Sequence, residues 1–365
     1  MTEDSTLADV PPLDNGGPII SSFEFMPAWQ FYLPLVPHIL GLALRSGGLT
    51  TLTAANPAIP GGGLVGESKT QVMDLVRGSP RKLIAPYTKF TRTSAPFPTD
   101  NILQQMSREG ITFPAVAKPD ISCRGVGIAK LKSLDELANY WDAFPMDADF
   151  IIQELIDMEP EAGIFYLRHP DWDTPQLFSM TLKYTPSVTG DGTSTLRELI
   201  SNDARAQLTA DVYFQKPNLN RESVPAKGAR IKLAFAGNHC RGSVFRDGAE
   251  FVTPELTAAI DRVARAMPVF HFGRLDIRFE TLAKLQQGIG FRIIEINGVG
   301  SEATHIWDNR FELNEARKVL REQYAHAYTI GAKMRNQGNR PIGLWQLIKM
   351  WLHERQLTKH YPVSE

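Results

Sequence analysis

The sequence predicts an α+β fold, because strand-like and helix-like segments both occur along its 365 residues. Residues 273–280 (GRLDIRFE) and 291–301 (FRIIEINGVGS) alternate apolar and polar side chains, which is the period-two pattern of half-buried strands. Residues 253–267 and 342–357 instead repeat apolar side chains at helical spacing. In the second of these helices, Trp345, Leu347, Ile348 and Trp351 are interpreted as packing residues rather than a cofactor surface. A chain of this length is expected to form two or three packed subdomains rather than one small core.

Shorter segments complete the set of predicted elements. Ser133 and Glu136 have the capping-box spacing that opens a helix, and Pro254 after Thr253 predicts where the helix at 253–267 begins. The other predicted elements are a helical run at 70–76, a strand–loop–strand unit at 113–130, a helix at 133–144, a strand at 149–156 and a strand–loop–helix unit at 177–200.

The N-terminal part differs in composition from the rest of the chain. Residues 1–20 are rich in Pro, Gly and Asp and are expected to be disordered. Residues 25–44 carry no fixed charge and are long enough to raise the question of a membrane span. Pro27, Pro34 and Pro37 argue against a regular spanning helix, because each removes a backbone donor. Buried packing or a partner surface is therefore favoured over a membrane-interface anchor.

Composition excludes some classes of function. The net charge is −1 with both signs interspersed, so there is no electrostatic footprint for nucleic acid. The two cysteines, Cys123 and Cys240, lie far apart, form no disulfide framework and are compatible with a reducing cytosol. The acidic N-terminus lacks the basic start of a signal peptide, so a cytoplasmic protein is expected. Whether it forms a homo-oligomer stays open.

Three oxygen-bearing side chains are expected to converge on the two C-terminal strands. Asp276 lies on the first strand, and Glu295 and Asn297 lie two apart, hence on one face, of the second. A short stretch ending in Gln286–Gln287–Gly288 is expected to join the strands as a loop. Carboxylates along strands also fit the wet face of a sheet, but Asn is a poor strand former. Oxygen ligands of this kind suit Mg²⁺.

A second cluster follows the strand that ends at Lys118. Gly125 and Gly127, flanked by Ser122 and Arg124, would let backbone N–H groups approach phosphate oxygens, and Lys118 would neutralise phosphate charge. The spacing matches neither the G-x-G-x-x-G nor the Walker A pattern, and a plain hairpin turn is the alternative.

The order of these clusters resembles the ATP-grasp superfamily, which includes D-alanine–D-alanine ligases, RimK-like ligases and cyanophycin synthetase. The resemblance is carried by Lys69 in GESK, Lys118 in AKPDISCRGVGIAK, Gln153–Glu154 in IIQELI, Asp276 in RLDIRFE, and Glu295 with Asn297 in EINGVGS. It covers roughly residues 66–310. The segment KYTPSVTGDGTSTLRELI additionally resembles the TGDG loop of cyanophycin-synthetase-like members.

The resemblance implies an ATP-grasp fold in which two α+β subdomains hold ATP between them. Residues 66–310 would form the ATP-grasp domain, with a smaller lysine and glycine-loop part at 66–148 and a larger metal-binding part at 149–310. Residues 1–65 would be a short N-terminal extension, and residues 311–365 a helical C-terminal tail. Many relatives have a larger domain before the nucleotide site, so part of the acceptor platform would be missing, replaced by residues 23–50 or supplied by another subunit.

The resemblance also implies a role for each matching residue. ATP phosphates would contact Lys69, Lys118 and the loop residues Ser122, Arg124, Gly125 and Gly127. The adenine would lie near Gln153, Glu154 and Ile156, and Glu161 would bind the ribose. Mg²⁺, with Mn²⁺ as an alternative, would be held by Asp276, Glu295 and Asn297. Arg274 and Lys118 would be catalytic, Arg274 by stabilising the transferred phosphoryl group or the acyl phosphate.

Some roles in this scheme have competitors. Gly298, Gly300 and Ser301 would form part of the acceptor pocket through backbone contacts. Lys183 and Arg241 are further candidates for phosphate or substrate contacts, and each is equally well explained as a surface charge. Lys82 and Lys89 compete with Lys69 as the first phosphate lysine.

The activity implied by the resemblance is an ATP-dependent carboxylate–amine ligase that works through an acyl phosphate and releases ADP and phosphate. Its substrates would be a small-molecule carboxylate and an amine, with amino acids as one class. The alternatives are an ATP-grasp kinase and a nucleotide-binding scaffold without turnover, attached to a partner or membrane through residues 23–44.

Overall fold

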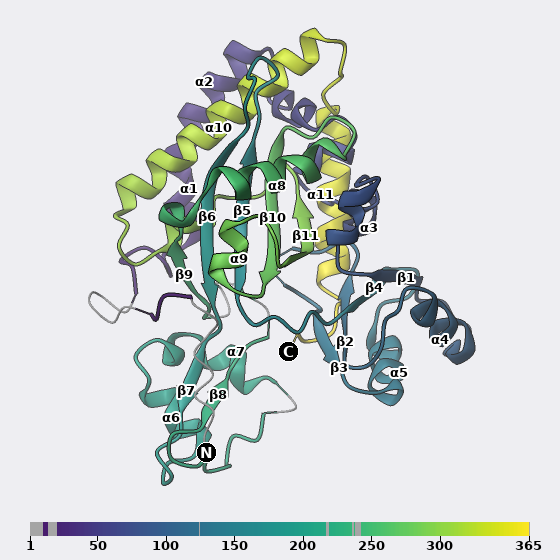
Figure 1. Cartoon of the computed structure of the whole chain (residues 1–365), viewed down its shortest axis with the longest axis vertical. Coiled ribbons are helices and arrows are strands. Elements are labelled where there is room, and N and C mark those ends of the chain that lie inside the picture. The colour runs from purple at the N-terminus through teal and green to yellow at the C-terminus, as the bar shows by residue number, and fades with distance from the viewer. Residues whose placement is uncertain are drawn as a thin grey trace.

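A computed structural model describes residues 10–13, 20–123, 125–216, 219–235, 237 and 242–364. In these ranges the chain forms a five-stranded, a four-stranded and a two-stranded sheet with helices around them (Figure 1). All paired strands within the sheets are antiparallel. The predicted α+β class is therefore confirmed.

The helices are α1 (Ala28–Tyr32), α2 (Val36–Ser46), α3 (Lys69–Met73), α4 (Thr99–Arg108), α5 (Leu134–Ala143), α6 (Leu196–Asn202), α7 (Ala210–Phe214), α8 (Pro254–Arg265), α9 (Leu282–Gln286), α10 (Leu313–Asn336) and α11 (Leu344–Thr358). The strands are β1 (Tyr87–Thr91), β2 (Ala115–Pro119), β3 (Ala129–Leu131), β4 (Asp149–Glu154), β5 (Glu161–Leu167), β6 (Gln176–Tyr184), β7 (Ser187–Thr189), β8 (Arg230–Lys232), β9 (Val244–Asp247), β10 (Phe272–Phe279) and β11 (Phe291–Asn297).

The large sheet, in the order β11-β10-β5-β6-β9, is covered on both faces. Side chains such as Leu275 and Ile277 pack with α8 and α9 on one face. Phe165 and Phe272 point the other way and pack with α2 and α10. Burial on two faces explains why β5 is buried along its whole length and is apolar after Glu161, whereas β10 and β11 keep polar positions beside the site.

The small lobe is built on the sheet β1-β4-β2-β3, with α4 and α5 on one side. Its core contains Ile102, Trp141 and Phe150. The predicted start of α5 is confirmed, because Ser133 Oγ accepts a hydrogen bond from the backbone N–H of Glu136. The carboxylate of Glu136 accepts from Lys132 rather than Ser133, so only half of the predicted capping box forms.

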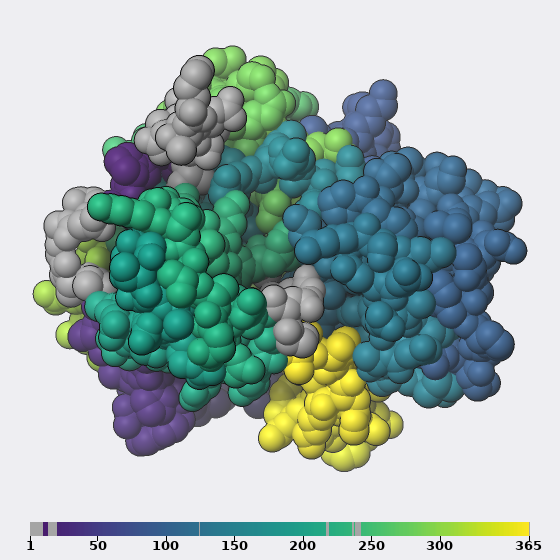
Figure 2. Space-filling model, turned by 90° about the horizontal axis from the view of Figure 1, so that it is seen from below, coloured from purple at the N-terminus to yellow at the C-terminus, as the bar shows by residue number. Residues whose placement is uncertain are grey.

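A further lobe carries β7, β8, α6 and α7 around its own small core, which includes Val188, Ile200 and Tyr213. Its helix α6 begins with a complete capping box between Thr195 and Glu198, which the strand–loop–helix prediction did not specify. Seen from below, this lobe and the small lobe lie on either side of a hollow, with the C-terminal segment in yellow beside it (Figure 2).

The apolar N-terminal segment packs on the large body, as its prolines suggested. Pro34 and Pro37 stand in first helical turns, where a missing N–H is tolerated. Phe31 and Leu35 are buried in a core with residues of α10. One row of the segment stays exposed: Trp29, Leu33, Val36, Leu40 and Leu44. In the described parts of the chain, no helix is both long enough and apolar enough to cross a membrane.

The predicted disorder at 1–20 is tested only in part. Residues 1–9 and 14–19 lie outside the described residues. Val10 and Leu13 pack against the main core, and Pro11 O accepts a hydrogen bond from Tyr184 OH at 2.7 Å. This short piece of the expected disordered stretch is thus bound to the folded body.

Two expectations about local structure were wrong. The connection between β10 and β11 is not a plain loop but contains α9, whose cap Thr281 accepts from the N–H of Lys284. Five helical residues are too few for a periodic pattern to appear in the sequence. Along α11, Trp345 and Trp351 were interpreted as packing residues, yet they are 68% and 44% exposed.

Candidate functional site

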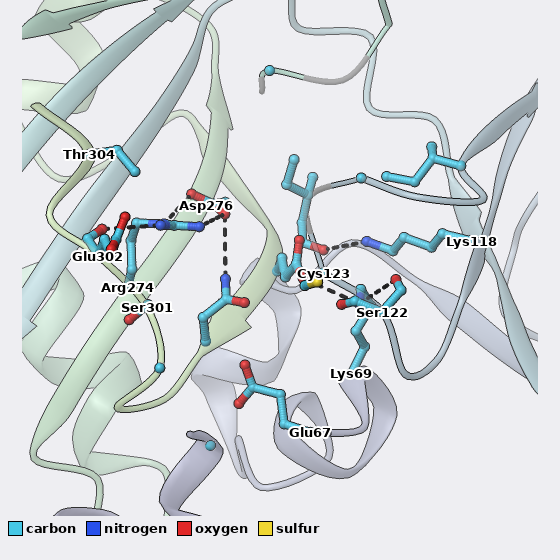
Figure 3. A pocket seen from close by; sticks show the side chains of 18 of the residues that line it. Glu67, Lys69, Lys118, Ser122, Cys123, Arg274, Asp276, Ser301, Glu302 and Thr304 are labelled. Atoms are coloured by element: carbon cyan, nitrogen blue, oxygen red, sulfur yellow. Dashed lines mark hydrogen bonds and ion pairs between the residues drawn. The ribbon is translucent and has the colours of Figure 1, made fainter. Parts of the chain in front are cut away.

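A cavity of about 800 Å³ lies where the large sheet, the small lobe, the N-terminal segment and α11 meet. Its two walls face each other in Figure 3, with Arg274 and Asp276 on the large-sheet side and Lys69 and Lys118 opposite. Glu67 lies below the gap between them. The cavity therefore brings together residues from both clusters that the sequence singled out.

The large-sheet wall is set by the register of β10 against β11. Asp276 pairs with Glu295, and Arg274 pairs with Asn297, so all four lie on one face. The register shifts between Asp276 and Ile277, which leaves Ile294 as the extra residue of a bulge. The predicted strand pair thus places Asp276, Glu295 and Asn297 together, and all three line the cavity.

Asp276 is held by two cations. Arg274 Nε and Nη2 lie 3.0 Å from Oδ1 and Oδ2 of Asp276, and Lys183 Nζ lies 2.9 Å from Oδ1. Lys183 also donates to Glu161 Oε1 at 2.8 Å. Burial alone would raise the pKa of Asp276, but Arg274 and then Lys183 outweigh it and hold that pKa below its ordinary value. Glu161, Lys183, Asp276 and Arg274 therefore form one continuous ionic network on this wall.

The opposite wall carries the two lysines. Lys69 Nζ donates to Ser122 O at 2.8 Å and Ser122 Oγ at 3.1 Å, and it lies 3.5 Å from Glu295 Oε1. Lys118 Nζ crosses the cavity to donate to Ile294 O at 2.9 Å. Burial lowers the pKa of Lys118 to about 8, and Glu295 opposes this shift only in part. Both lysines are at most 5% exposed.

Lys69 owes its position to the start of α3. Ser68 caps the helix by accepting from Gln71 N, and Asp120 at the end of β2 accepts from both Ser68 Oγ and Thr70 N. The competing lysines do not line the cavity: Lys82 is exposed and Lys89 pairs with Asp149 at 3.2 Å.

The loop after β2 reaches the cavity only partly as expected. Gly125 has φ +69° and lines the cavity with Ser122. Gly127 has φ +75°, and a Cβ there would lie 2.6 Å from Pro119 Cγ. Gly127 does not line the cavity, and its N–H donates to Ser364 Oγ at 2.8 Å on the buried side. Its expected contact with phosphate stays a prediction. Two predicted site residues, Arg124 and Arg241, lie outside the described residues.

The expected adenine residues line the cavity but have partners of their own. Gln153 Nε2 lies 3.4 Å from Ala85 O and from Ile294 O. Glu154 pairs with Arg292 at 3.2 Å. Ile156 offers an apolar surface, and Glu161 is bound by Lys183.

The glycines after Asn297 were expected to offer their backbone to an acceptor, and in this structure two of their N–H groups donate within the protein. The contact with an acceptor stays a prediction. The amide of Gly300 donates to Gly63 O at 2.8 Å, and that of Gly298 donates to Glu67 Oε2 at 3.1 Å. A Cβ on Gly298 would lie 2.3 Å from Gly62 O, so the two backbones could not approach. These glycines dock the N-terminal loop, while Gly300 and Ser301 still contribute to the cavity wall.

Several cavity residues escaped the sequence analysis. Glu67 accepts from Gly298 and faces the cavity, and burial raises its pKa to about 8. Its position two residues before Lys69 was a usable signal. Tyr32 donates to Glu302 Oε1 at 2.6 Å, so residues 24–32 do supply a wall of the cavity. Trp351, Glu354, Arg355, Thr358 and Lys359 add a wall from α11 and the residue after it, and no local pattern announced this.

The donor set fits Mg²⁺ in chemistry, though its oxygens already have partners. Asp276 and Glu295 are carboxylates facing one cavity, and Asn297 adds an amide oxygen. Within the described residues, no three His, Cys, Asp or Glu side chains form a metal-type cluster. A cation would thus depend on Asn297 and on the phosphates of a nucleotide as further ligands.

No family model and no curated protein sequence matches the chain. Solved structures that match it include a bifunctional glutathione synthetase from Pasteurella multocida, with 16% identity over 66% of this chain and 34% of that one, at a TM-score of 0.34. The VanG D-Ala:D-Ser ligase from Enterococcus faecalis matches with 15% identity over 70% of this chain and 61% of that one, at 0.39. The ADP complex of purK, an N5-carboxyaminoimidazole ribonucleotide synthetase, matches with 12% identity over 65% and 45%, at 0.34.

The chain spans less than two thirds of the length of each of these structures. Structural matches with TM-scores of 0.39 or less give no basis for assigning a substrate or an activity.

Proposed function

We propose that the protein is an ATP-dependent carboxylate–amine ligase that forms an acyl phosphate and releases ADP and phosphate. The observation that carries the proposal is the pairing of two walls across one cavity. Lys69 and Lys118 stand opposite Arg274 and Asp276 (Figure 3), and Glu295 pairs with Asp276 on the large-sheet wall. Cations facing acidic oxygen donors are what a magnesium–nucleotide complex requires.

The lysines would bind the ATP phosphates. Both now donate to neutral oxygens, Lys118 to Ile294 O and Lys69 to the two oxygens of Ser122. A phosphate oxygen carries charge and makes the stronger hydrogen bond, so nucleotide would draw the ammonium groups from these partners. Lys69 would at the same time leave Glu295.

Asp276, Glu295 and Asn297 would hold Mg²⁺, with Mn²⁺ as an alternative. When bound, the ion would supply charge neutralisation and orientation of the phosphate oxygens. Glu295 is 25% exposed along its side chain and has a single lysine contact at 3.5 Å, which makes it the more accessible carboxylate of the pair. Asp276 would contribute while Arg274 and Lys183 keep it ionised.

In the proposed reaction, phosphorylation gives the carboxylate a good leaving group, phosphate, in place of a poor one, oxide. A carboxylate oxygen of the acid attacks the γ-phosphorus of ATP, the bond to the bridging oxygen breaks, and ADP leaves. The amine nitrogen then attacks the acyl carbon, phosphate departs with the bonding electrons, and the amine proton passes to solvent. Arg274 would stabilise charge on the transferred group, which is the main work of such a site.

The cavity has room for a second substrate beyond Arg274. There it is lined by Tyr32, Ser301, Glu302, Thr304 and Trp307. Tyr32 of the N-terminal segment lines this part of the cavity, which supports the proposal that the segment replaces part of an acceptor platform. We infer that the acid and the amine, with amino acids as one class, would bind in this part of the cavity.

The test is release of ADP and free phosphate from Mg-ATP with pooled amino acids and small carboxylates. Glu295→Ala is expected to abolish release while circular dichroism stays unchanged, because the accessible metal carboxylate is lost. Glu255→Ala, on the exposed first turn of α8, is the matched control and should release at the wild-type rate. ADP without free phosphate would indicate a kinase instead. Full activity of Glu295→Ala would overturn the site.

A further inference from the structure

The last described residues of the chain bind the loop between β2 and β3 (residues 120–128) on the side away from the cavity. Ser364 Oγ accepts from Gly127 N at 2.8 Å and donates to Gly125 O at 2.9 Å. Tyr361 OH donates to Ile121 O at 2.8 Å. Ser364 is only 4% exposed, although it lies 237 residues from Gly127. Three hydrogen bonds from one short segment therefore fix both ends of this loop.

The segment is itself anchored on two bodies. The ring of Tyr361 stacks on Phe144 with centroids 5.2 Å apart, inside the small-lobe core that Leu357 also joins. Toward the other end, Glu354 Oε2 accepts from Gly66 N at 2.8 Å. The segment 354–364 thus connects the loop, the small lobe and the turn that carries Glu67 and Lys69.

The geometry leaves the cavity side of the loop to a ligand. Gly127 is buried and uses its N–H on Ser364, whereas Gly125 and Ser122 line the cavity. Both glycines have positive φ, a backbone that needs support because an unrestrained glycine has many alternatives. The bond to Gly125 O fixes the peptide next to the cavity without covering it. Arg355 and Lys359 on the same segment also line the cavity and add positive charge there.

We propose that residues 354–364 are a strap that holds the β2–β3 loop ready for nucleotide phosphates, with Tyr361 and Ser364 as positioning residues. This inference rests on the proposed function for the identity of the ligand. The strap pays the ordering cost of the loop before the ligand arrives, so its loss weakens binding of phosphate-bearing ligands. The adenosine part, bound at the β4 side, is unaffected.

The experiment measures Mg-ATP and adenosine binding by calorimetry on Ser364→Ala and Tyr361→Phe. Tyr361→Phe keeps the ring on Phe144 and removes only the hydroxyl. Val363→Ala is the matched control, because Val363 lies in the same segment and is 62% exposed. We expect the Kd for Mg-ATP to rise about 3–10-fold in Tyr361→Phe, which loses one hydrogen bond, and at least as much in Ser364→Ala, which loses two. Binding of adenosine, and both affinities of the control, should be unchanged. Amide exchange at residues 121–123 and 125–128 should accelerate in Ser364→Ala.

Any other outcome contradicts the proposal that residues 354–364 order the loop for phosphate binding. An unchanged Kd would mean that the loop is ordered without the strap, and tighter binding would mean that the strap restrains the loop in the wrong state. Equal weakening for adenosine would indicate general damage, which a fall in Tm would reveal. A wild-type protein that binds neither ligand would instead refute the proposed function, and with it the strap.

Discussion

The two walls of the cavity are built on different electrostatic principles. On the large sheet, Asp276 has both carboxylate oxygens bound by the charged groups of Arg274 and Lys183. On the small-lobe side, Lys118 and Lys69 donate mainly to neutral oxygens. Breaking the first set leaves buried charges without compensation, whereas the second can be exchanged at little cost. The large-sheet wall is therefore expected to be structural as well as functional, and the lysine wall to be functional.

The largest expected effect is on the large-sheet wall. Asp276→Asn keeps the size of the side chain but leaves Lys183 with Glu161 alone and Arg274 without its carboxylate. Removing one partner of a buried ionic pair costs about 3–5 kcal/mol. Urea unfolding should show a loss of that order together with loss of turnover.

If Asp276→Asn kept the wild-type free energy of unfolding, the large-sheet wall would not be structural, and the difference between the two walls would be contradicted. The control is Asp100→Asn on the exposed first turn of α4, which should unfold within about 0.5 kcal/mol of wild type. A small change in the test variant as well would mean that the network contributes charge to the site but little to the fold.

The next effect separates function from stability on the lysine wall. Lys118→Gln should lower turnover about 10²–10³-fold, as expected when one charge-stabilising donor is removed. Its free energy of unfolding should change by at most about 1.5–3 kcal/mol, because a single hydrogen bond from a charged group, the one to Ile294 O, is lost. Initial rates and urea unfolding on the same preparation test both halves, with exposed Lys82→Gln as the control.

The same lysine gives the wall a pH dependence. Burial lowers the pKa of Lys118 to about 8, so its positive charge is present below that pH and is lost above it. Affinity for ATP should therefore fall as pH rises through about 8, and Lys118→Gln should flatten this profile. A wild-type profile without that limb would place the titrating lysine elsewhere.

The parts of the structure that follow from local pattern could be predicted from the sequence. Period-two alternation gave the pair β10 and β11, and adjacency then put Asp276 beside Glu295. Spacing also located the start of α5 at Ser133. The roles of these site residues and the limits of the domains stay predictions.

The remaining features depend on contacts between distant residues, which leave no local signal. Gly298 was interpreted as a donor to a substrate, but its close approach to Gly62 is a contact across 236 residues. Ser364 carries no motif at all, and its role appears only when the fold brings it to Gly127. A bulge that exposes Ile294 O to Lys118 is likewise decided by pairing, not by composition.

Glu67 lies between the two walls and makes the smallest of the expected effects. Burial raises its pKa from 4.5 to about 8, so the folded protein binds its proton more tightly than the unfolded chain does. The stability from this group is then full below pH 4.5 and is lost as pH rises through about 8. Glu67→Gln, which cannot ionise, should match wild type at low pH and exceed it at high pH by about 1–3 kcal/mol, after allowance for solvent screening.

Urea unfolding across that pH range, with Glu109→Gln on the exposed end of α4 as the control, decides the matter. Parallel curves for wild type and Glu67→Gln would show that Glu67 titrates like an ordinary exposed carboxyl, and that the space between the walls is wetter than its burial indicates. Stability curves that meet at low pH and separate at high pH would show that ionisation of Glu67 destabilises the fold. Because Lys69 and Arg274 both act to lower its pKa, a bound nucleotide that draws Lys69 away should steepen the difference. Repeating the measurement with ATP would then show whether the lysine wall is the one that moves.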